Sequence, residues 1–249
     1  MTVPGPYRLV LLRHGQSEWN AAGIFTGWEN AHLTSRGEIE AARAGALLAE
    51  HGLLPASVHT SLQQRTIRTA DLCLAAADRD WIPVRRTWRL NGRHYGALQG
   101  RSKARVREQY GEQQVALWRR SYAVRPPPID AAAWQAQGDE PRYACLPREA
   151  RPRAESLAVV TERLLPFWYD AIVPDLLTVG CVLVVSHANT LRALVKYLDS
   201  IPDEQVAGLE IPTAMPLVYQ LGPDLRPDDL GGQYLDPHAA REASTVQLP

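Results

Sequence analysis

This 249-residue sequence lacks long apolar segments and a net charge. Its longest strongly apolar run, residues 179–185, is far too short to cross a bilayer, and no charged-then-apolar signal segment opens the chain. Its 27 basic and 27 acidic side chains cancel, so no global field draws it to nucleic acid or to a membrane. We therefore expect a protein that binds neither. A hydrophobic content of 45% and a charged content of 22% exclude global disorder and fibrous repeats.

Lysine and cysteine are also scarce. Of the 27 basic residues only Lys103 and Lys196 are lysines, which leaves 27 − 2 = 25 arginines. Arginine suits phosphate and carboxylate recognition through its planar fork, although genomic base composition explains the same excess. The three cysteines, Cys73, Cys145 and Cys181, are odd in number and widely spaced. They form neither a disulfide framework nor a zinc site, so we expect a cytoplasmic protein without a metal.

Strand-like and helix-like segments alternate along the chain. The predicted strands cover residues 8–12, 57–60, 181–185 and 217–221. The first predicted helix begins at Ser35, where Ser35-Arg-Gly-Glu38 resembles a capping box. Further helices are predicted over residues 61–77, over residues 153–172 and in the stretch after His187. This alternation predicts an α/β fold with a single doubly wound, mostly parallel sheet flanked by helices.

Two regions interrupt the alternation. Residues 121–153 contain too many prolines for a regular helix, and we expect a lid or loop insertion over the edge of the sheet. Residues 222–249 are rich in Pro, Asp and Gly and are expected to form a mobile tail. The predicted catalytic domain is therefore residues 1–221.

A histidine stands directly after each of the two clearest strands. His14 follows the first strand and His187 follows the strand at 181–185, each with an arginine nearby, Arg13 and Arg192. In a parallel sheet both side chains would project from the carboxyl ends of the strands, where α/β proteins bind ligands. One such histidine alone is more often a hydrogen-bonded loop residue, but two at equivalent strand ends predict a site. The absence of a third ligand nearby makes a metal centre the weaker interpretation.

An ordered set of motifs carries a family resemblance from about residue 8 to residue 221. The segment Leu-Leu-Arg-His-Gly-Gln-Ser-Glu-Trp-Asn at residues 11–20 resembles the phosphohistidine signature of the histidine phosphatase superfamily, closest to the 2,3-bisphosphoglycerate-dependent phosphoglycerate mutases. The likeness continues in the segments at residues 25–28, 60–65, 89–100, 118–120, 186–198 and 211–219. Arg-His-Gly alone is a weak signal, whereas the ordered set is specific.

The resemblance implies a phosphoglycerate mutase-like fold and a phosphohistidine mechanism. It makes His14 the nucleophile that accepts a phosphoryl group, with Arg13, Arg65 and His187 as the phosphate clamp. A neutral imidazole attacks at pH 7 without a base, and phosphoryl transfer otherwise needs in-line placement and cations on the equatorial oxygens. Gly15 is expected to let the backbone pass close to the phosphate.

The resemblance also implies substrate-binding positions and partners. The expected substrate-binding residues are Gly15, Ser17, Asn20, Thr26, Gly27, Gly92, Arg93, His94, Tyr95, Lys103, Arg119, Arg120, Ala188 and Asn189. In the mutases the positions of Lys103, Arg119 and Arg120 hold the substrate carboxylate and second phosphate. We therefore expect a small anionic phosphorylated metabolite as substrate, 2,3-bisphosphoglycerate as phosphoryl donor and primer, and a homodimer or homotetramer.

The sequence departs from the family pattern at Gly92, where the family motif Glu-Arg-His-Tyr-Gly has its general acid and base. Losing such a group typically costs roughly 10²–10⁴-fold in rate, and no carboxylate lies within five residues of position 92. A second departure is Ala188, which replaces a glycine and could crowd the phosphoryl pocket. An inactivating substitution made by experiment could look like Gly92, but Ala188 and the lysine-free tail favour natural divergence.

The leading hypothesis is an enzyme of the phosphoglycerate mutase type, which by resemblance interconverts 3-phosphoglycerate and 2-phosphoglycerate through 2,3-bisphosphoglycerate, with its turnover in question because of Gly92. The alternatives are a diverged phosphatase or phosphotransferase acting on an activated acyl or enol phosphate, and a phosphate-ligand-binding protein without catalysis. An acyl or enol phosphate releases a weaker base than an alkoxide and so needs less help from an acid. A substrate could also bring its own acid or base into the space at Gly92.

Overall fold

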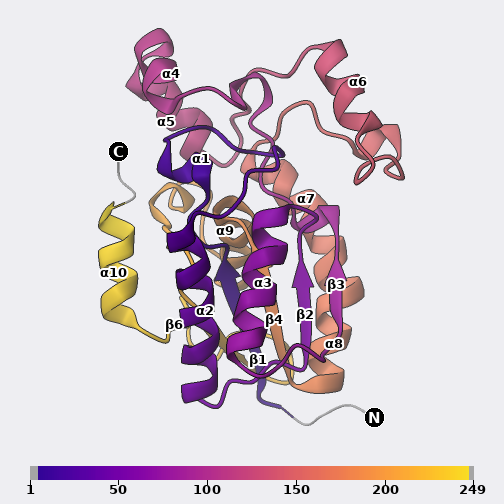
Figure 1. The fold of residues 1–249 in the computed structure, drawn as a ribbon, viewed down its shortest axis with the longest axis vertical. Helices are drawn as coiled ribbons and strands as arrows, with labels where there is room; N and C mark the ends of the chain where they lie inside the picture. The colour runs from indigo at the N-terminus through magenta and orange to yellow at the C-terminus, as the bar shows by residue number, and fades with distance from the viewer. Residues whose placement is uncertain (1–4, 247–249) are drawn as a thin grey trace.

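The computed structural model describes residues 5–246, with side chains as far as residue 242. One six-stranded sheet has the order β3-β2-β4-β1-β5-β6 (Figure 1). The strands are β1 Tyr7–Arg13, β2 Ser57–Thr60, β3 Val84–Arg86, β4 Cys181–Ser186, β5 Leu217–Leu221 and β6 Gln233–Tyr234. The pairs β1–β4, β4–β2 and β2–β3 are parallel, whereas β5 pairs antiparallel with both β1 and β6. The predicted mostly parallel α/β sheet is confirmed.

Helices cover both faces of the sheet because the central strands are apolar on both sides. Leu9 and Leu11 of β1 pack with α7 Leu157–Phe167, α8 Val173–Val179 and α9 Ala188–Leu198. Val10 and Leu12 face the other way and pack with α2 Ser35–Glu50 and α3 Gln64–Ala76. Successive side chains along a strand point to opposite faces, so a continuous apolar run is the pattern of a strand buried on both.

The remaining helices lie beyond the carboxyl ends of the strands or at one edge of the sheet. Figure 1 shows α1 Glu18–Ala21, α4 Lys103–Tyr110, α5 Glu112–Arg120 and α6 Ala131–Asp139 above the strand ends, and α10 Pro237–Val246 beside α2. This arrangement leaves the ends of β1 and β4 facing a cap made largely from residues 88–150.

Several expected boundaries were wrong. The N-cap of α2 is Thr34 rather than Ser35, because the Thr34 hydroxyl accepts from the Gly37 N–H at 3.0 Å. The expected helix over residues 153–172 begins at Leu157, capped by Ser156, and runs through a π-helical turn, Trp168–Ile172, into α8. Pro166 lies inside α7, two residues before the π-helical turn begins at Trp168.

The two irregular regions contain more regular structure than the sequence indicated. Within residues 121–153, the proline-free stretch after Asp130 forms α6, whose first turn is capped by the Asp130 carboxylate on Ala133 N–H at 2.7 Å. Within the expected tail, β6 adds to the sheet and α10 follows it. Residues 247–249 of that tail lie outside the described residues, and its mobility stays a prediction.

Candidate active site

Two histidines meet at the carboxyl ends of the two central strands. The β1–β4 register pairs Arg13 with Ser186, so the next residue on each strand is His14 and His187. The His14 N–H donates to the Ser186 carbonyl at 3.0 Å, and the two imidazole centroids lie 5.0 Å apart at an interplanar angle of 63°. Both side chains are about 5% exposed. The structure therefore brings the two rings together, and their role in one site stays a prediction.

The His14 ring is held in one tautomer. Its Nδ1 lies 2.7 Å from the Gly15 carbonyl, which can only accept, so Nδ1 carries the hydrogen and Nε2 keeps the lone pair. Burial, reinforced by the charges of Arg65 and Arg13, lowers the pKa of His14 well below its ordinary value. The ring is therefore neutral and oriented at pH 7, with a lone pair on Nε2.

A chain of hydroxyl groups fixes the tautomer of His187. The Thr66 hydroxyl donates to the Gln63 carbonyl at 2.8 Å, so the Ser61 hydroxyl must donate to Thr66 Oγ1 across their 2.6 Å contact. Ser61 Oγ then accepts from His187 Nε2 at 3.0 Å, which leaves Nδ1 as the lone-pair nitrogen of His187. Burial, followed by the Arg65 charge, lowers the pKa of His187 well below its ordinary value. A bound phosphate dianion would favour the protonated ring, which could then donate from Nδ1.

Arg13 and Arg65 complete what we call the cavity floor: Arg13, His14, Arg65 and His187. Arg65 is 2% exposed, and it donates to the carbonyls of Glu29 at 2.8 Å and Gly27 at 2.9 Å. Burial lowers the pKa of Arg13 to about 10 and that of Arg65 to about 9, so both guanidinium groups stay protonated at pH 7. All four floor residues line one cavity of about 560 Å³.

Further lining residues form what we call the cavity wall: Gly92, Arg93, Tyr95, Lys103, Arg119 and Arg120. Arg119 and Arg120 end α5, Lys103 begins α4, and all three are partly exposed. Burial lowers the pKa of Lys103 and of Arg119. The cavity therefore has a cationic floor and a cationic wall, which suits a small ligand with two anionic groups.

Tyr95 is the acidic group of this wall. Its hydroxyl accepts from Asn189 Nδ2 at 2.9 Å, and the Arg93 guanidinium carbon lies 4.6 Å from the ring centroid. Burial acts to raise the pKa of Tyr95, but the charges of Arg93 and Arg119 outweigh burial and lower it to about 7.

Most of the other predicted substrate-binding residues line the same cavity, namely Asn20, Thr26, Gly27, Ala188 and Asn189. Gly15, Ser17 and His94 are not among the lining residues. A Cβ on Gly15 would lie 2.2 Å from the Gly37 carbonyl oxygen, so a glycine is required where the loop meets α2, and its approach to a phosphate stays a prediction.

Ser17 and His94 support the structure around the cavity. Ser17 is the N-cap of α1, and its hydroxyl accepts from the Asn20 N–H at 3.2 Å. His94 is buried, accepts at Nδ1 from the Gly96 N–H at 2.9 Å, and contacts the Gln137 side chain through Nε2 at 2.6 Å. Sequence reasoning placed both next to the ligand because they lie inside the motifs.

Some charged residues that line the cavity were not predicted to bind substrate: Arg36, Glu40, Arg192 and Glu210. Arg36 and Glu40 are paired one turn apart on α2, and Glu40 also accepts from the Gln16 N–H. Glu210 pairs with Arg120 at 2.5 Å. The sequence offered one signal for Glu210, which directly precedes the Ile-Pro-Thr motif.

Gly92 lines the cavity but contributes no side chain to it. Its N–H donates to Gln63 Oε1 at 2.7 Å, and its backbone lies outside the left-handed region. A Cβ here would lie 3.1 Å from the Gly27 oxygen and 3.4 Å from Arg65 Nη2, so a side chain needs shifts of only a few tenths of an ångström. A carboxylate at this position would stand beside the cavity floor.

A family model for the histidine phosphatase superfamily (branch 1) matches residues 9–224. The chain belongs to the histidine phosphatase superfamily. Relatives named 2,3-bisphosphoglycerate-dependent phosphoglycerate mutase include one from Streptomyces avermitilis, 59% identical over 96% of this chain and 94% of that protein. Another, from Thermobifida fusca, is 57% identical over 94% of this chain and 95% of that protein. These relatives confirm the family expected from the motifs and that the chain is an enzyme of the phosphoglycerate mutase-like type.

Solved structures share the fold at lower identity. A mycobacterial glucosyl-3-phosphoglycerate phosphatase aligns with a TM-score of 0.68 and 23% identity, over 91% of this chain and all of that one. A putative α-ribazole-5′-phosphate phosphatase from Escherichia coli aligns with a TM-score of 0.64 and 23% identity, over 89% and 96% of the two chains. The sheet and its helices are thus those of the superfamily, in proteins that are named as phosphatases.

Within residues 5–246, no helix is both long enough and apolar enough to cross a membrane. The same residues hold no cluster of three or more His, Cys, Asp or Glu side chains placed to bind a metal ion.

Proposed function

We propose that this enzyme transfers phosphoryl groups through phosphorylated His14, and that it interconverts 3-phosphoglycerate and 2-phosphoglycerate with 2,3-bisphosphoglycerate as donor and primer. The observation that carries the proposal is the neutral His14 ring, with its Nε2 lone pair beside His187 in a cavity floored by two arginines. The names of the 55–59% identical relatives support the substrate.

The first half-reaction uses the cavity floor. The Nε2 lone pair of His14 forms the P–N bond while the P–O bond to the leaving oxygen breaks, and that oxygen keeps the electron pair. Arg13, Arg65 and His187 offset the charge on the equatorial oxygens. The substrate carboxylate and second phosphate are assigned to Lys103, Arg119 and Arg120 in the cavity wall.

The leaving oxygen of phosphoglycerate becomes an alkoxide and needs a proton, which Gly92 cannot give. Among the described residues that line the cavity, the carboxylates are those of Glu40 and Glu210, and both are engaged with arginines. This observation favours a second candidate, a phosphatase or phosphotransferase that acts on an acyl or enol phosphate, whose leaving group is a weaker base.

Phosphohistidine formation tests both enzymatic proposals. The protein is incubated with 2,3-bisphosphoglycerate, and an acid-labile phosphoryl group is sought on His14, with His14→Ala as the control. Labelling of the wild type alone is the expected result. A protein that binds phosphorylated ligands but gives no adduct with bisphosphoglycerate, acetyl phosphate or phosphoenolpyruvate contradicts both and leaves a non-catalytic binding protein.

Turnover separates the two enzymatic candidates. Conversion of 3-phosphoglycerate with catalytic 2,3-bisphosphoglycerate, at a rate ordinary for glycolytic enzymes, supports the mutase. Phosphate release from acetyl phosphate or phosphoenolpyruvate, with little conversion of phosphoglycerate, supports the second candidate. A homodimer or homotetramer stays a prediction.

A further inference from the structure

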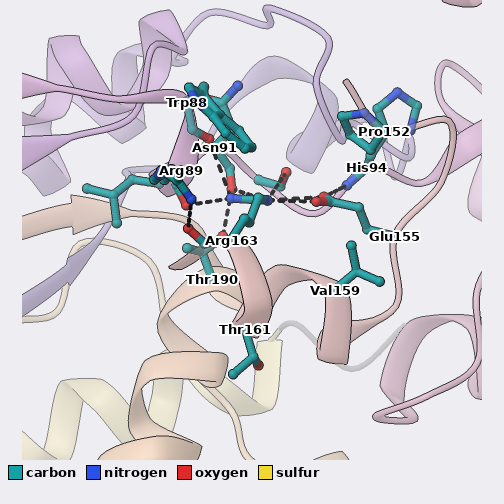
Figure 2. A network of polar contacts seen from close by, with 12 residues as sticks. Trp88, Arg89, Asn91, His94, Pro152, Glu155, Val159, Thr161, Arg163 and Thr190 are labelled. Atoms are coloured by element: carbon teal, nitrogen blue, oxygen red, sulfur yellow. Dashed lines mark hydrogen bonds and ion pairs between the residues drawn. The ribbon is translucent and has the colours of Figure 1, made fainter. Parts of the chain in front are cut away.

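A buried ion pair lies directly behind the cavity wall. Arg163 of α7 is 6% exposed and Glu155, just before that helix, is 1% exposed. The pair is held at two points, Nε to Oε1 at 2.6 Å and Nη2 to Oε2 at 3.1 Å. Figure 2 shows the guanidinium of Arg163 pointing from α7 toward the segment that carries Trp88, Arg89 and Asn91.

The remaining hydrogen-bonding capacity of Arg163 goes to four backbone carbonyl groups within residues 88–92. Nη1 donates to Arg89 O at 2.5 Å, and its contact with Trp88 O is longer, 3.4 Å. Nη2 donates to Asn91 O at 2.8 Å and to Gly92 O at 3.1 Å. The rigid, planar guanidinium group therefore constrains the conformation of the backbone over residues 88–92.

Further bonds tie one end of the segment to α7 and the other end to Glu155, just before that helix. Arg89 Nη1 donates to the Arg163 carbonyl at 3.0 Å. At the other end, the His94 N–H donates to Glu155 Oε2 at 2.8 Å, and the Glu155 N–H donates to the His94 carbonyl at 2.9 Å. We call residues 89–94 the clamped segment.

From the clamped segment, bonds lead to the cavity floor. The Gly92 N–H donates to Gln63 Oε1, and Gln63 Nε2 donates to the Gly27 carbonyl at 2.8 Å. That carbonyl also accepts from Arg65 at 2.9 Å. The position of the Arg65 guanidinium is therefore linked by hydrogen bonds to the position of the Gly92 backbone.

Other bonds lead from the clamped segment to the cavity wall. Arg93 Nη2 donates to the carbonyls of Trp118 at 2.7 Å and Arg119 at 3.1 Å, at the end of α5. The cations of that helix end are therefore placed by the same segment.

We propose that Arg163 and Glu155 are positioning residues for the anion-binding cavity, because they fix the backbone from which both Arg65 and Arg119 are placed. The role deepens the proposed function and rests on it for turnover, but not for anion binding. Burying two charges costs free energy that their attraction offsets only in good geometry, and apolar pairs often stabilise a core as well. We infer that the pair serves to place these carbonyl groups rather than to stabilise the core.

The test compares inorganic phosphate binding, by titration calorimetry, in variants that remain folded at the working temperature. Arg163→Lys keeps the charge but loses the fork, and we expect phosphate to bind about threefold to thirtyfold more weakly. The control is Leu164→Ala on the same helix. Leu164 is buried in the core away from the cavity, so this variant should lower the melting temperature and change the phosphate Kd less than twofold.

A double variant keeps the test decisive if Arg163→Lys does not fold. Arg163→Met with Glu155→Gln removes both buried charges, so it should fold but bind phosphate as weakly as Arg163→Lys. A phosphate Kd equal to that of wild type, or changed by the same factor as in Leu164→Ala, overturns the proposal.

Kinetics separate this proposal from the proposed function. With phosphoglycerate we expect these variants to raise KM and lower kcat together, unlike Leu164→Ala, because Arg65 and Arg119 contact the substrate and Arg65 also faces the charge that develops in the transition state. If KM and kcat both stay at the wild-type values, the positioning role is wrong. A wild-type protein that binds phosphate but turns over no phosphoglycerate contradicts the proposed function, whereas the phosphate comparison still decides the role of Arg163.

Discussion

The cavity floor and the cavity wall of this enzyme are built in different ways. The floor histidines extend two paired parallel strands, and their tautomers are set by the Gly15 carbonyl and the Ser61 hydroxyl. The wall is formed by irregular segments and the ends of short helices, and it carries partly exposed cations. Its position depends on the hydrogen bonds of Arg163. The floor holds the parts that every phosphohistidine reaction needs, so substrate choice and proton transfer are expected to vary through the wall.

The strongest way to sharpen this contrast is to give the wall the carboxylate that it lacks. We expect Gly92→Glu to raise mutase turnover by about 10²–10⁴-fold, since that is the usual contribution of a positioned acid. The Cβ contacts at 3.1–3.4 Å allow a side chain here. Conversion of 3-phosphoglycerate is measured with Gly92→Gln as the matched control. If the two variants are equally slow, the missing carboxylate is not what limits turnover.

A change in the floor should instead damage every phosphoryl transfer. We expect Arg65→Lys to lower kcat/KM about 10²–10³-fold, the typical cost of removing one donor to the developing charge. Lysine keeps the charge but cannot bridge the Gly27 and Glu29 carbonyls while facing the phosphate.

The control for that floor variant is Arg68→Lys on the same helix, where Arg68 is exposed and pairs with Glu38. Assays use phosphoglycerate and acetyl phosphate. A loss confined to phosphoglycerate would place Arg65 with the wall rather than the floor.

The same contrast governs what could be predicted from the sequence. His14 and His187 could be placed together because apolar strand-length runs end at each, and parallel strands bring their carboxyl ends to one edge. No comparable rule places Lys103 or Arg119, so their positions came only from the family motifs. Glu210 was missed because its partner, Arg120, lies 90 positions away in the sequence and no sequence pattern links the two.

Local signals also misled where a competing interaction was stronger. Ser35 has the spacing of a capping box, but Thr34 makes the cap because its hydroxyl reaches the Gly37 N–H. The motif could not indicate that Gly15 is also required by its close approach to the Gly37 carbonyl. Helix α6 was hidden because the prolines that mark the insertion flank it rather than lie within it.

Glu210 offers a smaller test of how the wall selects its ligand. Its carboxylate neutralises Arg120, and both side chains are about a quarter exposed. We expect Glu210→Gln to tighten 2,3-bisphosphoglycerate binding about threefold to fivefold, in line with an ion pair worth up to about 1 kcal/mol. Inorganic phosphate, which needs only the floor, should bind as in wild type. Calorimetry measures both, with Asp203→Asn, in the Lys196 pair outside the cavity, as control. Equal tightening for both ligands would show that floor and wall are not independent.

The smallest expected effect is a pH dependence that belongs to the wall alone. The pKa of Tyr95 is about 7 rather than 10, so its hydroxyl loses a proton as the pH rises through 7 in the free protein. The folded state then binds fewer protons than the unfolded state between pH 7 and 10, so this group adds stability as the pH rises.

The tyrosinate repels an anionic ligand, and 2,3-bisphosphoglycerate should bind about twofold to threefold more weakly at pH 8.5 than at pH 6.5. In the protein without ligand the floor histidines stay neutral over this range, because their pKa values lie well below 6.5. Tyrosinate absorbance at 295 nm and ligand affinity are followed together, with Tyr95→Phe as control. A ligand-affinity profile that stays the same in Tyr95→Phe would move the pH dependence from the wall to the ligand or to the floor.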